Sequence, residues 1–244
     1  QYPLAAGQEN RLPPEPRLDK GVPFSELDTV FFGMAAEQVK IIPGTNIPAA
    51  YLLYAEQYGF TSQSFPFTVG WGRDSRDSAL SPSRGRMQRV SGEFGVLGDA
   101  HYFRGDYQFQ QFVPLTKQFT FAFNGELGYG KGLNGQRYPV FKNFYSGGLG
   151  SVRGFEQGTL GPRDVTGSIV GGSKKLTLNA EFLAPFPGAG NDRSLRVYVF
   201  ADAGNVWADN EKMSFSDLRA SYGAGVSWIS PMGPLRIAIA QPVR

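Results

Sequence analysis

Few residues in this chain have side chains suited to catalysis or metal binding. The sequence has 244 residues, no Cys and one His, His101. The lack of Cys excludes disulfides, zinc ribbons and thiol catalysis. A Ser-His-Asp triad or a metal site would have to include His101, and its position at the edge of a loop favours a surface role instead. We therefore expect a protein that is not an enzyme, with no catalytic residues, no metal and no cofactor.

Two acidic residues, Glu181 and Asp202, interrupt segments that are otherwise rich in apolar residues. Paired carboxylates can cleave glycosides, but no other feature of the sequence marks a sugar-binding cleft. Lys and Arg number 24 against 21 Asp and Glu, a net charge of +3 without basic blocks. This charge pattern gives no nucleic-acid-binding surface. The role of the two carboxylates must therefore be sought in the elements that carry them.

Most of the chain alternates between bulky apolar and small or polar residues, which is the period of a β-strand. In segment 119–129, for example, Phe121 and Phe123 share one face, whereas Asn124 and Glu126 share the other. We count roughly nine strands of about ten residues each. They lie near 30–41, where the pattern is least regular, and at 65–72, 90–97, 103–113, 119–129, 176–182, 195–203, 218–228 and 235–240.

The predicted strands are joined by two kinds of connection that alternate. Short turns marked by Pro lie at 81–85, 113–117, 185–191 and 230–234, and mostly longer links lie at 43–64, 98–102, 131–172 and 208–216. This rhythm is typical of an antiparallel up-and-down meander. Such a sheet belongs either to a soluble sandwich, with the apolar face inside, or to a membrane barrel, with the apolar face toward lipid. The strand length and the polar opposite face favour the barrel.

Segment 1–23 differs from the rest because it contains five Pro residues and little alternation. We interpret it as a loop or as the irregular end of a preceding strand. The longest connection, 131–172, is rich in Gly but also contains Phe144, Tyr145 and Phe155. A loop of this length is usually functional or disordered, and its aromatic residues argue against disorder.

Four motifs occur in a fixed order along the chain. Val152-Arg153-Gly154-Phe155 lies in the long loop, and Glu181 lies in segment 178–182. Segments 200–207 and 227–235 follow. Together, over residues 24–241, they resemble the C-terminal barrel of the BamA/TamA superfamily of bacterial outer-membrane proteins. Within this superfamily, the resemblance is to the assembly factors.

The resemblance implies a role for the long loop. In the family this loop folds back into the barrel, where its Arg meets acidic residues on the next two strands. By motif, the Arg is Arg153 and the acids are Glu181 and Asp202. The alternation places both acids on the polar face of their strands. The loop-lock motif is then Val152, Arg153, Gly154 and Phe155, with Phe200, Gly204 and Trp207 as supporting residues. Trp207 would either belong to an aromatic girdle or pack against the loop.

The resemblance also implies an all-β, antiparallel, up-and-down transmembrane β-barrel, of which about nine of the family's sixteen strands are recognisable here. We therefore expect a fragment of a longer protein. The implied function is to fold and insert β-barrel proteins into the bacterial outer membrane. The implied partners are outer-membrane lipid, unfolded barrel clients and accessory lipoproteins, the last mostly through POTRA domains outside this chain. A polypeptide secretion pore of the TamA or FhaC type is an alternative, and a passive porin or receptor barrel is another.

Overall fold

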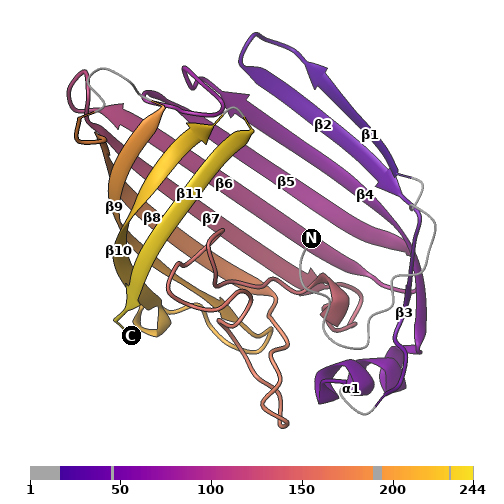
Figure 1. The fold of residues 1–244 in the computed structure, drawn as a ribbon. Coiled ribbons are helices and arrows are strands. Elements are labelled where there is room, and N and C mark those ends of the chain that lie inside the picture. The colour runs from indigo at the N-terminus through magenta and orange to yellow at the C-terminus, as the bar shows by residue number, and fades with distance from the viewer. Residues whose placement is uncertain (1–16, 45–46, 189–193, 231, 244) are drawn as a thin grey trace.

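A single antiparallel sheet of eleven strands forms the framework of the structure (Figure 1). The computed structural model describes residues 17–44, 47–188, 194–230 and 232–243. The strands follow one another across the sheet in chain order, with one exception. Both β2 and β3 pair with the same strand, β4. The strands are β1 (Arg17–Pro23), β2 (Asp28–Ala35), β3 (Glu37–Lys40), β4 (Thr61–Asp74), β5 (Gly85–Gly98), β6 (Tyr102–Pro114), β7 (Thr120–Gly132), β8 (Lys174–Pro185), β9 (Leu195–Trp207), β10 (Arg219–Ser230) and β11 (Gly233–Pro242).

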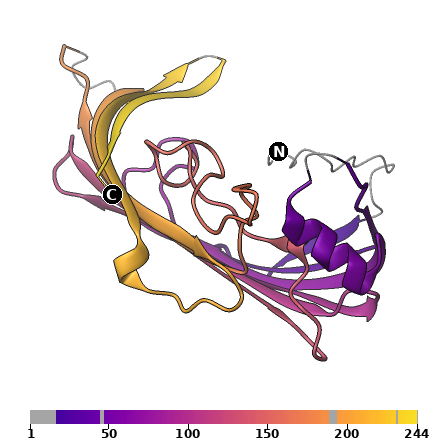
Figure 2. The ribbon, with the colours of Figure 1, turned by 90° about the horizontal axis from the view of Figure 1, so that it is seen from below.

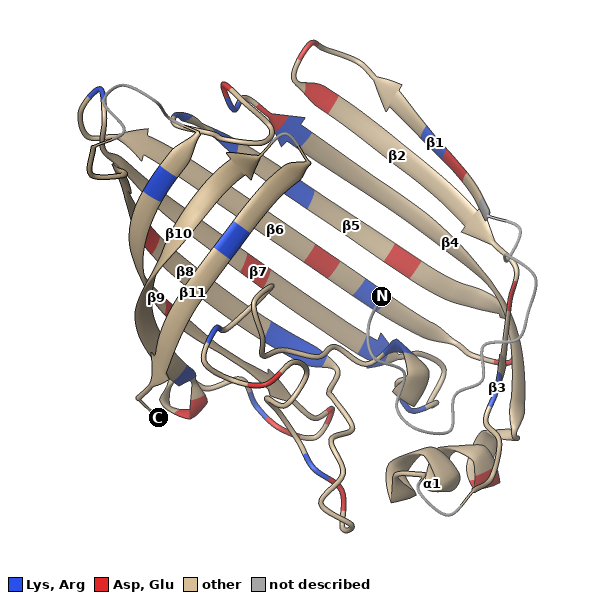
Figure 3. Cartoon of the chain, in the orientation of Figure 1, with Lys and Arg blue, Asp and Glu red and all other residues tan. Residues whose placement is uncertain are grey.

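The sheet is strongly curved, and the long connection between β7 and β8 lies on its concave side (Figure 2). Within the described residues, β1 and β11 form the two edges of the sheet. Charged side chains are carried by many of the strands (Figure 3). The strand registers place several of these charged residues on the concave face, among them Glu93, Arg104, Glu126, Glu181 and Asp202.

The convex face is apolar, as the alternation in the sequence predicts. Phe121, for example, is 38% exposed and Val199 is 54% exposed, so neither is packed in a dry interior. The other large apolar side chains exposed on this face include Phe32, Met34, Phe67, Val90, Val96, Tyr107, Leu127, Tyr129, Phe182, Tyr222, Trp228, Leu235, Ile237 and Ile239. An apolar surface of this extent requires an apolar environment or another protein surface.

All nine predicted strands are present, but the predicted number is two too low. Residues 17–23, expected as a loop or irregular strand end, form the regular strand β1, which pairs along its length with β2. Its apolar positions, Leu18 and Val22, are separated by Lys20, so the alternation was too short to recognise. Residues 1–16 of that predicted segment lie outside the described residues, as does part of the predicted turn at 185–191. The segment predicted near 30–41 contains two strands, β2 and β3.

The link at 43–64 contains an α-helix, α1 (Ala49–Tyr58), which sequence analysis missed. Tyr51, Tyr54 and Ala55 of α1 are buried with Ile41, and partly buried residues of the long loop, including Phe141, pack against this cluster. The loop contains the short 3-10 helix η1 (Val140–Lys142), and η2 (Phe215–Asp217) follows β9. Among the described residues, no helix has the length and apolar composition needed to cross a bilayer.

Candidate functional site

Arg153 lies at the centre of a buried ion cluster, between the long loop and strands β8 and β9. Its Nε donates to Oδ2 of Asp202 at 2.7 Å and its Nη2 donates to Oδ1 of the same carboxylate at 2.7 Å. Its Nη1 donates to Oε1 of Glu181 at 2.6 Å. The backbone N–H of Arg153 also donates to Asp202, at 3.0 Å. The guanidinium therefore forms a two-bond fork with one carboxylate and a single bond with the other, which fixes its orientation.

The strand register explains how two carboxylates can flank one guanidinium. Asp202 is opposite Asn179 and Glu181 is opposite Phe200, so the two acids are diagonal neighbours on adjacent strands. Side chains in this relation lie about 7–8 Å apart, a separation that a planar guanidinium can bridge. Both acids lie on the concave face, as their position in the alternation predicts.

The cluster is closed by aromatic rings and by a second arginine. The guanidinium carbon of Arg153 lies 3.6 Å from the centre of the Phe200 ring and 5.7 Å from that of Tyr198. Nη2 of Arg236, on β11, donates to the remaining oxygen of Glu181 at 2.7 Å. Arg236 and Tyr198 were not predicted as site residues. An Arg within the apolar segment 235–240 was the available signal for Arg236.

Burial distinguishes Arg153 from Arg236. The side chains of Arg153, Glu181 and Asp202 are 7%, 6% and 0% exposed, whereas that of Arg236 is 47% exposed. A buried ion pair is sensitive to loss of one partner because the other charge is then left without compensation. Arg153 is thus the residue on which the cluster depends.

The residues on either side of Arg153 fit closely against the sheet. Val152 is fully buried, and a Cβ placed on Gly204 of β9 would lie 2.7 Å from its Cγ2. Gly154 has a φ of +87°, a conformation that favours Gly, and it lies against Ser221, Ala240 and Pro242 of β10 and β11. Val152 therefore lies against β9, Arg153 binds to β8 and β9, and Gly154 lies against β10 and β11.

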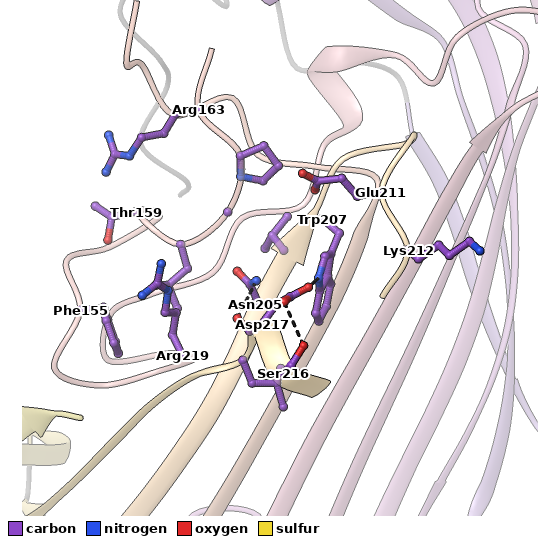
Figure 4. A pocket seen from close by; sticks show the side chains of 15 residues that line it. Phe155, Thr159, Arg163, Asn205, Trp207, Glu211, Lys212, Ser216, Asp217 and Arg219 are labelled. Carbon is purple, nitrogen blue, oxygen red and sulfur yellow. Dashed lines mark hydrogen bonds between the residues drawn. The ribbon is translucent and has the colours of Figure 1, made fainter. Parts of the chain in front are cut away.

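Trp207 is buried and therefore does not form part of an exposed aromatic girdle. It is 3% exposed, and its backbone oxygen would lie 2.1 Å from a Cβ on Gly172 at the end of the loop. Its Nε1 donates to Asp217 at 3.2 Å (Figure 4). Its indole thus bonds to the β9–β10 connection, and Trp207 lines a cavity that the loop also lines.

A cavity of about 820 Å³ lies between the loop and the β9–β10 connection (Figure 4). Phe155 lines it, together with Arg163 and Arg219, which are basic, and Glu211 and Asp217, which are acidic. This mixture of charges does not define one class of ligand. In the described residues, no group of three or more His, Asp or Glu side chains could hold a metal ion.

The outer part of the loop is attached to α1 through Asp164. Its carboxylate accepts hydrogen bonds from the backbone N–H of Ala49, at the start of α1, and from the backbone N–H groups of Thr166 and Ser168. Oη of Tyr51 in α1 also lies 3.1 Å from Oη of Tyr145 in the loop. The loop and α1 are thus joined by both polar and apolar contacts.

The contact between Asp164 and α1 is expected to weaken in acid. The hydrogen bond from the Thr166 side chain and those from backbone N–H groups lower the pKa of Asp164. A carboxylate with a lower pKa in the folded state contributes stability above its unfolded pKa, about 3.9, and loses it as the pH falls through the folded value. Amide exchange of α1, corrected for intrinsic rates, should therefore increase below about pH 4. Asp164→Ala should show faster exchange at neutral pH and lose this dependence; an equal acid response in both proteins would contradict the assignment.

Comparison with known proteins agrees with this architecture. Over 91% of its length the chain is 37% identical to the outer membrane protein assembly factor BamA of Neisseria meningitidis, and it covers 33% of that protein, about a third. A crystal structure of BamA from Haemophilus ducreyi lacking POTRA domains 1–3 superposes with a TM-score of 0.85 at 23% identity, covering 93% of this chain and 50% of that one.

A second solved structure has a more distant form of the same fold. CdiB from Acinetobacter baumannii superposes with a TM-score of 0.60 at 14% identity, over 93% of this chain and 38% of that one. The family model for the Omp85 superfamily domain matches residues 17–244. The chain therefore belongs to the Omp85 superfamily.

Proposed function

We propose that this chain forms part of the barrel wall of an outer-membrane protein assembly factor, which folds β-barrel proteins and inserts them into the bacterial outer membrane. The observation that carries the proposal is the inside-out sheet with Arg153 held on its concave face by Glu181 and Asp202. The identity to BamA of Neisseria meningitidis supports the assembly role in particular.

The proposed mechanism uses no covalent chemistry and no cofactor, and the protein is not an enzyme. The convex apolar face contacts outer-membrane lipid, because strands of 12 to 14 residues such as β4, β5 and β8 exceed the roughly 9–11 residues needed for a tilted crossing. Unfolded barrel proteins are the clients, and an exposed strand edge can pair with an incoming strand through backbone hydrogen bonds. Accessory lipoproteins would bind mainly to POTRA domains outside this chain.

The anchored loop supplies stiffness in this proposal. A curved sheet held only by hydrogen bonds between neighbouring strands can change its curvature by small shifts at each pair. A loop fixed on the concave face resists those shifts because it contacts several strands at once. This chain then contributes the rigid wall and the loop that braces it.

The test is reconstitution of the full-length protein in lipid vesicles with an unfolded outer-membrane barrel as client. We expect the client to become membrane-integrated and protease-resistant several-fold faster than in vesicles without the protein. A secretion pore, the alternative function, would instead deliver a polypeptide across the bilayer into the vesicle interior. A passive porin would give steady single-channel conductance without client insertion. Either result would contradict the proposal.

A further inference from the structure

A second ion cluster, which is partly buried, fixes the long loop far from Arg153. Nζ of Lys142, at the end of η1, lies 2.7 Å from Oε2 of Glu37 on β3 and 2.8 Å from Oε1 of Glu93 on β5. The three side chains are only 13%, 15% and 22% exposed. Oη of Tyr102, on β6, donates to the same oxygen of Glu93 at 2.6 Å. One loop lysine therefore pairs with acids on two strands, and one of these acids also accepts a hydrogen bond from a third strand.

The backbone of Lys142 is held as firmly as its side chain. Its carbonyl oxygen accepts hydrogen bonds of 2.9 Å from Nη1 of Arg104, on β6, and from Oη of Tyr138. The guanidinium carbon of Arg104 also lies 4.1 Å from the centre of the Phe144 ring, two residues farther along the loop. Residue 142 is thus fixed to the sheet from two directions.

The register shows that this cluster is distant from the Arg153 cluster. Following strand partners across the sheet, Asp202 on β9 corresponds to Met87 on β5, and Glu93 lies six residues farther along that strand. Six residues span about 20 Å along a strand, and the four strand spacings from β5 to β9 span about 19 Å. The two clusters have no residue in common.

We propose that Lys142 is a positioning residue that forms a second anchor of the loop, independent of Arg153, and that the two anchors together hold the curvature of the sheet. Backbone pairing fixes each strand only to its neighbours. The loop connects β3, β5 and β6 at one end to β8, β9 and β11 at the other, so it spans the concave face. Only the expected effect of this device on client insertion rests on the proposed function.

A role in geometry explains why the cluster is ionic. Burying an ion pair costs desolvation free energy, and the attraction between the charges often does no more than offset that cost. A protein with a well-packed apolar replacement can therefore be equally stable. The three partly buried charges therefore contribute little to the free energy of folding. What they specify is position, because Lys142 must lie within reach of acids on two strands that are separated by β4.

The experiment uses the full-length protein in lipid bilayers and two independent measurements. Amide exchange follows segments 138–144 and 151–155 separately. Pulsed spin-label distances between Val90→Cys on β5 and Val199→Cys on β9 follow curvature; both side chains are on the exposed convex face, and this chain has no other Cys. Variants are Lys142→Met, Arg153→Ala and their combination. Lys175→Met, which removes a 2.6 Å ion pair with Glu126 outside the loop, is the matched control.

We expect Lys142→Met to lower protection of 138–144 by about 10-fold, because it removes the bonds to Glu37 and Glu93 but leaves those of the residue 142 carbonyl, while 151–155 keeps its protection. Either single variant should broaden the β5–β9 distance distribution, and the double variant should broaden it no further. The reason is that the loop links β5 to β9 only while both ion clusters are intact, since its contact through Asp164 is with α1. The control should leave both measurements unchanged. Equal loss of protection in both segments, or an unchanged distance distribution in Lys142→Met, would overturn the proposal.

A further variant distinguishes the loss of the anchoring contact from the effect of leaving Glu37 and Glu93 without a cationic partner. Lys142→Met combined with Glu37→Gln and Glu93→Gln removes every charge of the cluster. If the broad distance distribution persists, the anchor itself is what matters; if the wild-type distribution returns, the effect came from uncompensated acids and the proposal fails. Client insertion is measured on the same samples. Wild-type protein that inserts no client would reject the proposed assembly function, whereas the distance and exchange results would still decide the role of Lys142.

Discussion

Arg153→Ala is expected to release the long loop from the concave face of the sheet at a cost of about 3–5 kcal/mol in docking free energy. The substitution removes all three side-chain hydrogen bonds to Asp202 and Glu181. Asp202, whose side chain is fully buried, would then have lost its cationic partner. Amide exchange of segment 151–155 in the full-length protein should accelerate by about 10²–10⁴-fold, and client insertion should slow.

Arg236→Ala is the matched control because Arg236 contacts the same carboxylate, Glu181, at 2.7 Å. Its side chain is 47% exposed, so solvent screens the pair and its loss should cost at most about 1 kcal/mol. Arg153→Lys should give an intermediate result, because lysine keeps the charge but cannot form the two-bond fork. Equal effects of Arg153→Ala and Arg236→Ala, or wild-type protection in Arg153→Ala, would show that this cluster does not hold the loop.

The strands and their faces were predictable because one physical rule governs both. In a sheet that is apolar on one side and polar on the other, each residue's position in the alternation determines its face. Glu181 and Asp202 could therefore be placed on the concave face from their neighbours alone. Alternation could not show which face was buried, since a sandwich has the same period.

The elements that sequence analysis missed lack such a rule. Strand β3 has four residues, too few for alternation to show. Helix α1 follows Pro48, has no side-chain cap and is apolar around most of its circumference, so it carries neither a capping nor an amphipathic signal. It is stabilised instead by packing against Ile41 and the long loop, a contact formed only when the chain folds.

Lys142 illustrates the same limit for the site. Its partners Glu37 and Glu93 belong to different strands and are far from it in the sequence, and a single Lys in a long loop is ordinarily a solvated residue. The two anchors also differ in how the sequence presents them. Arg153 lies in a recognisable motif, whereas Lys142 becomes apparent only through its buried contacts.

The second large expected effect concerns the close approach of the loop to β9 at Gly204. A Cβ at this position would lie 2.7 Å from Cγ2 of Val152 and 2.8 Å from the backbone oxygen of Leu176. Real side chains do not tolerate such distances, so Gly204→Ala must displace either the loop or the strand pairing. Overpacking of this kind costs about 1–3 kcal/mol, and the displacement should carry Arg153 away from Asp202.

The contributions of the loop and the strand can be separated by a second substitution. Val152→Ala removes the methyl group nearest to the new Cβ. In the double variant, Gly204→Ala with Val152→Ala, amide protection of Arg153 and its neighbours should therefore be higher than the sum of the two single effects predicts. The clash with the Leu176 oxygen remains in the double variant, and its cost should appear as faster exchange across β8 and β9.

Gly125→Ala provides the matched control for adding a methyl group to a strand glycine in the same sheet. A Cβ on Gly125 would meet its nearest atoms at 3.6 to 4.0 Å, which is ordinary van der Waals contact. Because this position is on the convex face, away from the loop, exchange of segment 151–155 should be unchanged. If Gly204→Ala behaved like Gly125→Ala, the loop would tolerate displacement from β9 and the close fit around Val152 would not be needed to hold Arg153 in place.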